Sequence, residues 1–301
     1  MFIKYTIMFM NSICNYVVFL MLVCSVSCSK NVDVDEMASD NISSTSNTPN
    51  DSSDGDVASD SNTPNDSSDG DVASDSNNNS SNTAEEGVPD VFNKIYAASR
   101  IYLDEEYVVV AVNGAPDHNS PYYASSHELY EAYNGVNENY KKNPNSISTF
   151  DFEFKIPLNP KEATNKTPTP LGSIGVALNG VSFYNQYAGP NNQPLTNEIN
   201  SFDQYGGHPT GQKVYHYHLE PYYLTTKQGN NALMGFLLDG FPVYGPEENG
   251  ERLTNSDLDE YHGHNHKTAD YPDGIYHYHI TDADPYINGS GYFGTPGTVT
   301  Q

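Results

Sequence analysis

Tyr276-His277-Tyr278-His279 repeats, letter for letter, the earlier tetrapeptide Tyr215-His216-Tyr217-His218. In a β-strand, side chains alternate between the two faces of the sheet, and each residue advances the chain by about 3.3 Å. A His-x-His step therefore places two imidazoles on one face, about 6.6 Å apart at the backbone, where both can reach one metal ion. The tyrosines, which favour strands, point to the other face. A single step of this kind is equally compatible with an ordinary polar strand face.

The similarity between the two halves of this region extends well beyond the tetrapeptide. Residues 175–184 (GVALNGVSFY) align with residues 235–244 (GFLLDGFPVY). Residues 202–208 (FDQYGGH) align with residues 258–264 (LDEYHGH). The motifs follow the same order in both halves, and only the loop lengths differ. Such an internal duplication predicts two similar substructures related by a pseudo-two-fold axis.

Each half supplies one Gly-His and one His-x-His, so the sequence predicts two metal-binding histidine triplets. Three imidazoles with an open fourth position form a familiar catalytic metal site. The repeat does not decide whether the triplets form two sites or share one. The predicted metal ligands are His208, His216 and His218 in the first half and His264, His277 and His279 in the second.

Asp117 and His118 place a carboxylate beside an imidazole in a loop after a short apolar run. An Asp-His pair on its own is usually part of a turn. This one is of interest because eight of the ten histidines lie in or beside the duplicated motifs. We therefore regard Asp117 and His118 as candidate acid/base groups or additional ligands.

Four further residues flank the triplets. Asp203 and Asp259 each precede the His of a Gly-His by five positions. Each carboxylate either orients a ligand imidazole or caps a turn. His262 and His266 lack counterparts in the first half and are expected to be accessory residues.

The first 28 residues predict a secretory signal peptide. Their apolar run is too short for a transmembrane helix, which needs about 20 residues. Cys28 ends a stretch that resembles a lipoprotein cleavage box, so a lipid anchor at Cys28 is the expected membrane contact. All three cysteines lie in this segment, and the remainder of the chain has no disulfide. We expect a secreted protein of the cell envelope, lipid-anchored at the outer membrane or the cell surface.

Residues 29–90 are predicted to be a disordered tether. From residue 31 onward they contain fifteen Asp or Glu and no Lys or Arg, and Ser and Asn fill much of the rest. Such a segment cannot bury enough apolar surface to offset its chain entropy. A fifteen-residue unit, SNTPNDSSDGDVASD, occurs twice in tandem at residues 46–75. Its acidic residues do not have the spacing of a calcium-binding EF-hand, so we interpret it as a solvated spacer.

Residues 91–301 are long enough for one well-cored domain. Frequent Tyr, Val and Phe, with Gly, Pro and Asn at short intervals, predict a mainly β fold with few short helices. Residues 107–112 and 148–156 are expected strands, and residues 127–133 are the best candidate for a short helix. The net charge of −26 argues against nucleic acid as a partner.

Several ordered motifs together resemble the YHYH family, named for the tetrapeptide. They include residues 113–118, residues 156–160, the Gly-Gly-His-Pro of residues 206–209, the run LDGFPVYGP at residues 238–246, and both tetrapeptides. The resemblance implies a secreted or envelope-associated domain without an agreed activity. Members often carry Cys two residues before Gly-His, where this chain has Tyr205 and Tyr261, so thiolate ligands are excluded here.

The remaining donors are imidazole, carboxylate, phenol and water, for which zinc and copper(II) are the leading ions. The main hypothesis is a metal-binding extracytoplasmic domain, which acts as an enzyme if one coordination position stays open. A protein that stores or delivers metal is the second possibility. The alternative is a metal-free structural, interaction or adhesion module on the cell surface, in which the histidines form a buried hydrogen-bond network.

Overall fold

A computed structural model describes residues 84–289 and 291–301 of the chain. This part is mainly β, as the composition predicted, and in it we find one α-helix, α1 (Tyr222–Gln228). Its strands and loops surround one main core of buried aliphatic and aromatic side chains. Residues 1–83, which include the predicted signal peptide, Cys28 and the tandem repeat, lie outside the described residues.

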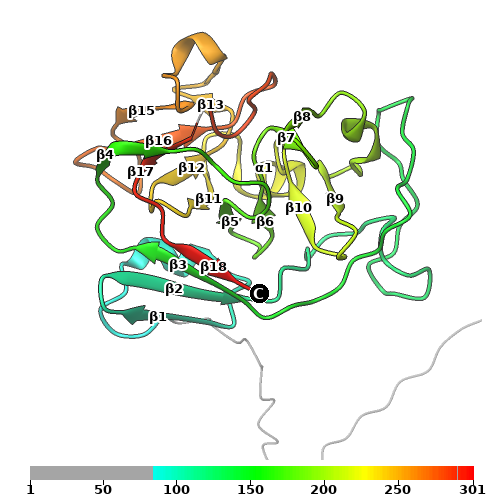
Figure 1. The fold of residues 1–301 in the computed structure, drawn as a ribbon, viewed down its shortest axis with the longest axis horizontal. Helices are drawn as coiled ribbons and strands as arrows, with labels where there is room; N and C mark the ends of the chain where they lie inside the picture. The colour runs from blue at the N-terminus through cyan, green and yellow to red at the C-terminus, as the bar shows by residue number, and fades with distance from the viewer. Residues whose placement is uncertain (1–83, 290) are drawn as a thin grey trace, which may run out of the picture. The chain divides into compact units, whose positions relative to one another are not determined.

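An eight-stranded sheet carries five of the six predicted metal ligands, and the sixth, His218, directly follows β10. It extends across the upper part of Figure 1 from β15 to β9. The strands, in order across the sheet, are β15 (Gly263–His266), β16 (Ile275–His279), β12 (Pro242–Tyr244), β11 (Leu233–Leu237), β5 (Gly175–Ala177), β6 (Ser182–Phe183), β10 (Tyr215–Tyr217) and β9 (Gly207–Pro209).

The strand order has the same pattern from either edge of this sheet. The antiparallel pair β5 and β11 lies at the centre. On each side an antiparallel hairpin, β5 with β6 or β11 with β12, is followed by a parallel step to β10 or β16. An antiparallel edge strand, β9 or β15, completes each half. The aligned motifs therefore occupy equivalent strands, and the two Tyr-His-Tyr-His segments lie next to opposite edges.

The Asn/Asp-Gly of each aligned segment forms the turn of its hairpin. Gly180 has φ +78° between β5 and β6, and Gly240 has φ +89° between β11 and β12. Residues other than Gly rarely adopt positive φ, so both turns depend on glycine. Each turn reverses the chain within its hairpin, and β10 or β16 then pairs with the second strand of that hairpin.

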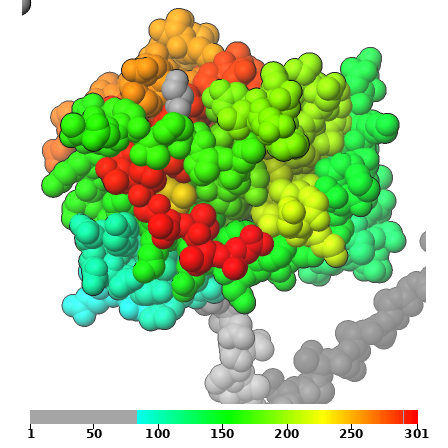
Figure 2. All heavy atoms as spheres, in the orientation of Figure 1, coloured from blue at the N-terminus to red at the C-terminus, as the bar shows by residue number. Residues whose placement is uncertain are grey.

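A smaller four-stranded sheet, in the order β1, β2, β3 and β18, packs against the same core. Its strands are β1 (Arg100–Asp104), β2 (Tyr107–Val112), β3 (Phe152–Pro157) and β18 (Thr298–Thr300). β2 and β3 confirm the two strands predicted there, although β3 begins four residues later than expected. Its buried residues alternate with half-buried ones, because one face of the sheet covers the core. In Figure 2 the C-terminal segment that ends in β18 crosses the visible face to reach this sheet.

Short elements connect the two sheets and shape the loops near the sheet edges. Three pairs of short strands are β4 (Glu162–Thr167) with β17 (Tyr292–Gly294), β7 (Tyr187–Ala188) with β8 (Gln193–Pro194), and β13 (Glu247–Glu248) with β14 (Glu251–Arg252). Three 3-10 helices are η1 (Asp90–Lys94), η2 (Glu198–Ser201) and η3 (Asn255–Asp257). In the described ranges 84–289 and 291–301, no helix has the length and apolar character needed to cross a bilayer.

Some residues before 91 pack against the domain: Val88 is buried, and the backbone N–H of Glu85 donates to the carbonyl of Ile101. Local composition did not reveal this, since the acidic residues continue to Asp90. The helix predicted at residues 127–133 is wrong: a turn at residues 128–129 leads to an isolated β-bridge at Tyr130, and residues 131–133 are irregular. There the His127 ring stacks on Tyr123, with 4.1 Å between the ring centroids.

Candidate metal centres

The first histidine triplet lies on the edge pair β9 and β10. His208 of β9 is directly opposite His216 of β10, and His218 follows two residues later on the same face. All three side chains are buried, with at most 3 % exposure. The period of two thus places the imidazoles together, as the sequence predicted, while Tyr215 and Tyr217 point into the core.

The Nδ1 atoms of His216 and His218 face backbone carbonyls. His216 Nδ1 lies 3.1 Å from the oxygen of Val214, and His218 Nδ1 lies 2.5 Å from the oxygen of Asn185. Carbonyl oxygens only accept, so both Nδ1 atoms carry the proton. A neutral imidazole has one N–H, and each Nε2 therefore presents a lone pair.

His208 has the same tautomer for a different reason. The Ser201 hydroxyl donates to the carbonyl of Glu198 at 2.7 Å, so its oxygen accepts from His208 Nδ1 at 2.6 Å. η2 supplies both partners, because Glu198 and Ser201 are its first and last residues. A 3-10 turn, rather than a strand, therefore orients the third imidazole.

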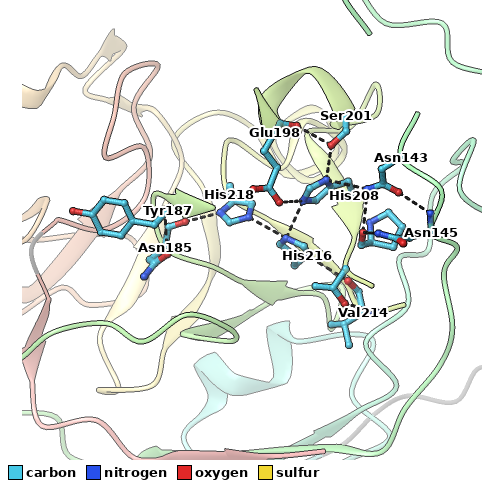
Figure 3. Close-up of polar contacts among 12 residues, drawn as sticks. Asn143, Asn145, Asn185, Tyr187, Glu198, Ser201, His208, Val214, His216 and His218 are labelled. Carbon is cyan, nitrogen blue, oxygen red and sulfur yellow. Dashed lines mark hydrogen bonds and ion pairs between the residues drawn. The ribbon is translucent and has the colours of Figure 1, made fainter. Parts of the chain in front are cut away.

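The three Nε2 atoms converge on one point (Figure 3). His216 Nε2 lies 3.1 Å from His208 Nε2 and 3.0 Å from His218 Nε2. Glu198 adds a carboxylate oxygen, which lies 3.1 Å from His208 Nε2. The four donor atoms lie within 4.8 Å of one another. We call Glu198, His208, His216 and His218 the first centre.

Burial keeps the imidazoles of His216 and His218 neutral. It lowers the pKa of His218 to about 4 and that of His216 well below its ordinary value, and the neighbouring His208 would repel any charge on either ring. Near neutral pH these rings therefore retain the lone pairs that a metal ion needs.

The second triplet repeats this arrangement on β15 and β16. His264 pairs in register with His277, with 3.1 Å between their Nε2 atoms, and His279 follows on the same face. His277 Nδ1 donates to the oxygen of Ile275 at 2.9 Å, and His279 Nδ1 donates to that of Gly245 at 2.8 Å. Burial lowers the pKa of His277 to about 4 and that of His279 to about 3. His279 Nε2 is buried and has no hydrogen-bond partner in the described structure.

Glu248 completes this second set, with its donor atoms again within 4.8 Å of one another. We call Glu248, His264, His277 and His279 the second centre. Glu248 Oε1 lies 3.6 Å from His264 Nε2 and 3.9 Å from His277 Nε2. It also accepts a hydrogen bond of 2.8 Å from Nδ1 of His266, the exposed histidine at the end of β15.

The sequence did not identify either carboxylate, because the two glutamates do not occupy equivalent positions. Glu198 comes from η2, which follows the β7–β8 hairpin, whereas Glu248 is part of the β13–β14 hairpin itself. Alignment of the two halves pairs Glu248 with Ala188. The repeat, which located the histidines, therefore carried no information about the carboxylates.

Each centre borders a cleft. A cavity of about 450 Å³ adjoins the first centre, where the Tyr184 ring stacks on His216 with 3.9 Å between centroids. A cavity of about 330 Å³ adjoins the second centre, where Tyr244 meets His277 edge-on at 5.1 Å. Tyr184 and Tyr244 occupy equivalent positions in the aligned segments. Both centres thus have a tyrosine wall and a space for a small molecule.

Asp117 and His118 do not join either centre. His118 is buried, donates from Nδ1 to the oxygen of Asn119, and accepts at Nε2 from the Tyr217 hydroxyl at 2.9 Å. Since Tyr217 points away from His216 and His218, His118 lies on the other face of the sheet. Asp117 accepts from the hydroxyl of Tyr96 there. The catalytic roles predicted for Asp117 and His118 therefore have no geometric link to the metal centres.

Asp203 and Asp259 serve turns and tyrosines instead of imidazoles. Each accepts from the backbone N–H two residues ahead, at 2.9 Å. Asp203 also accepts from Tyr215, and Asp259 from Tyr276, both at 2.9 Å. Of the two roles considered, turn capping is the one observed. The partners that orient the ligand imidazoles are backbone carbonyls and Ser201.

His262 and His266 differ in their contacts. His262 is buried and lies 3.0 Å from the hydroxyl of Thr281, outside both centres. His266 touches the second centre through Glu248. Of these two accessory histidines, one is therefore structural and one borders a centre.

The six predicted ligands thus form two sets of three next to opposite edges of one sheet. Residues 153–252 and 247–291 match the model of the YHYH protein family. No curated protein and no solved structure matches the chain. The matched stretch contains both tetrapeptides and all eight residues of the two centres, and residues 153–291 of this chain belong to the YHYH protein family.

Proposed function

We propose that this YHYH domain binds two transition-metal ions, one at each centre. The observation that carries the proposal is the position of His216 Nε2, 3.1 and 3.0 Å from two other Nε2 atoms while all three Nδ1 atoms carry the protons. Lone pairs facing one another in a buried site repel, and a cation removes this repulsion.

The distances agree with a tetrahedral ion. Zinc binds imidazole nitrogen at about 2.0–2.1 Å, which places neighbouring ligands of a tetrahedron about 3.3 Å apart. The contacts of 3.0–3.1 Å in the first centre are slightly shorter than this spacing. A small outward movement of the rings would admit the ion.

Without a metal ion, added protons would leave some Nε2 lone pairs of the first centre without a partner. One proton on His208 would form an ion pair with Glu198, but it would leave His216 and His218 facing each other. Protonating either of these needs a buried imidazolium, which the lowered pKa values oppose. The metal-free module therefore requires a strained, half-satisfied cluster.

In the second centre, protons could satisfy the nitrogen lone pairs almost as well as a metal ion. A proton on His264 Nε2 can be shared with His277, which leaves only His279 Nε2 without a partner. The metal assignment there rests on this orphaned nitrogen and on the equivalence with the first centre.

Zinc is the ion we favour, and copper(II) is the second candidate. The donors are imidazoles and a carboxylate, a set that suits both ions. Zinc prefers the tetrahedral arrangement that two strands and a nearby turn can supply, whereas copper(II) prefers tetragonal geometry.

Metal content tests the proposal. We expect two ions per chain in the full-length protein purified with a histidine-free tag and measured by elemental analysis. The double variant His216→Ala/His218→Ala should hold one ion, because the other centre stays intact. His127→Ala, an exposed histidine outside both centres, is the matched control and should keep two. A stoichiometry near zero in the wild-type chain, with the fold intact by circular dichroism, contradicts the proposal and favours the metal-free module.

We further propose that the protein is extracytoplasmic and lipid-anchored through Cys28. The apolar run of residues 1–28 and its cleavage-box-like end support this. Cys28→Ser should then move the protein from the membrane fraction to the soluble fraction. An unchanged distribution would count against the anchor.

A further inference from the structure

Building on the proposed function, we infer that the two centres differ in coordination. The first centre is closed by Glu198, whereas the second keeps a position open to a small anion from solution. The difference lies in where each carboxylate stands relative to the ligand nitrogens.

Glu198 stands at ligand distance in the first centre. Its Oε1 lies 3.1 Å from His208 Nε2, close to the spacing of about 3.3 Å between ligands of a tetrahedral zinc ion. An ion bound by the three imidazoles could therefore take Glu198 as its fourth donor, next to His208. No position remains for a ligand from the adjoining cleft.

Glu248 approaches no nitrogen of the second centre as closely as Glu198 approaches His208. Its Oε1 is 3.6 Å from His264 Nε2 and 3.9 Å from His277 Nε2, both beyond the tetrahedral spacing. A hydrogen bond of 2.8 Å from His266 Nδ1 holds the same oxygen on the far side. In the strand register, Thr210 is the first-half counterpart of His266, so the first centre has no such restraint.

Lys267 is a cation on the wall of the cleft beside the second centre. This cleft of about 330 Å³ is lined by Lys94 and Lys267 and also by the carboxylates Glu247, Glu248 and Asp270. Lys94 pairs with Asp270, while Lys267 makes no ion pair with any carboxylate in the described ranges. A small anion that occupies the open position would be attracted mainly by the metal ion, and Lys267 adds a positive charge to the wall of the same cleft.

Azide titration of single-centre variants tests this difference. His216→Ala/His218→Ala retains the second centre, and His277→Ala/His279→Ala retains the first. Each full-length variant is loaded with cobalt(II), whose visible absorption reports the ligands around the ion, and is then titrated with azide. We expect a saturable spectral change for the protein that retains the second centre and none for the one that retains the first.

The outcomes separate the two proposals. Failure of both variants to take up cobalt, with a native circular dichroism spectrum, contradicts metal binding itself. Uptake of cobalt by both, with an azide response at the first centre or at neither, overturns the inference and leaves metal binding standing.

Two milder variants extend the test without removing imidazoles. Glu198→Gln weakens the fourth donor, and we expect it to make the first centre responsive to azide. His266→Ala frees Glu248 to approach the ion, and we expect it to lower azide affinity at the second centre by about tenfold, as is usual when a partner of this kind is lost. An unchanged azide response in both variants would show that these carboxylates do not control access.

Discussion

The two centres present the same histidine triplet in the same strand register, yet they differ in the carboxylate that joins it. Glu198 comes from a 3-10 turn and contacts a ligand nitrogen directly, whereas Glu248 comes from a short hairpin and is held by His266. All three histidines of the first centre are buried, while His264 of the second centre is 25 % exposed; the carboxylates are similarly exposed, Glu198 at 29 % and Glu248 at 21 %. A repeated motif can thus supply two histidine clusters whose carboxylates come from loops that the repeat does not share.

The largest difference between the centres should appear in metal affinity when each carboxylate is neutralised. Glu198→Gln removes a charged donor, and we expect the zinc affinity of the first centre to fall about a hundredfold, equivalent to about 2.7 kcal/mol. Glu248→Gln should lower the affinity of the second centre about tenfold or less, since Glu248 stands farther away.

Competition with a chelating dye in single-centre backgrounds measures both affinities. A larger loss for Glu248→Gln than for Glu198→Gln would reverse the assignment of closed and open centres.

The folding stability of the metal-free protein should also depend on pH, because histidines in both centres have lowered pKa values. An imidazole whose pKa is about 4 in the folded state and 6.5 when unfolded binds protons only on unfolding in that pH window, so acid lowers stability. Carboxyls with a raised pKa act in the opposite direction, because the folded state then holds more protons below about pH 6. The histidines with lowered pKa are His118, His216, His218, His262, His277 and His279, and the carboxyls with raised pKa are Asp203 and Asp239.

Since six such histidines oppose two carboxyls, the melting temperature of the metal-free chain should fall from about pH 6.5 to about pH 4. Replacing either His-x-His pair by alanine should make the fall shallower. Calorimetry across this range provides the measurement. A melting temperature that rises on acidification contradicts the assignment of neutral histidines.

A last comparison concerns the tyrosines on the opposite face of the sheet. The hydroxyl of Tyr278 donates to Asp239 at 2.6 Å and accepts from the N–H of Phe293, whereas that of Tyr217 bonds to neutral His118 and Asn179. Hydrogen bonds to charged groups are stronger, so Tyr278→Phe should cost about 3 kcal/mol and Tyr217→Phe about 1.5 kcal/mol.

Urea denaturation measures these costs, and both variants should keep two ions per chain. Loss of an ion in Tyr217→Phe would show that His118 does communicate with the first centre through the sheet.

Local patterns made a large part of this protein predictable. Alternation along a strand places His216 and His218 on one face and their tyrosines on the other, whatever the rest of the fold does. A continuous apolar run identified β2, and alternation identified the buried face of β3. Where no period was present, as at residues 127–133, the prediction failed because ring stacking and turns decided the conformation.

The amino-acid sequence by itself thus determined the mainly β fold, the family and the choice of the six histidines as candidate ligands. Composition, short motifs and strand alternation are all properties of residues close together in the chain. Only the tertiary structure decided that the triplets form two separate centres next to opposite sheet edges, and that Glu198 and Glu248 join them. It also placed His118 behind the sheet. These features depend on which distant strands pair and how loops of unequal length fold back, and no local period encodes either.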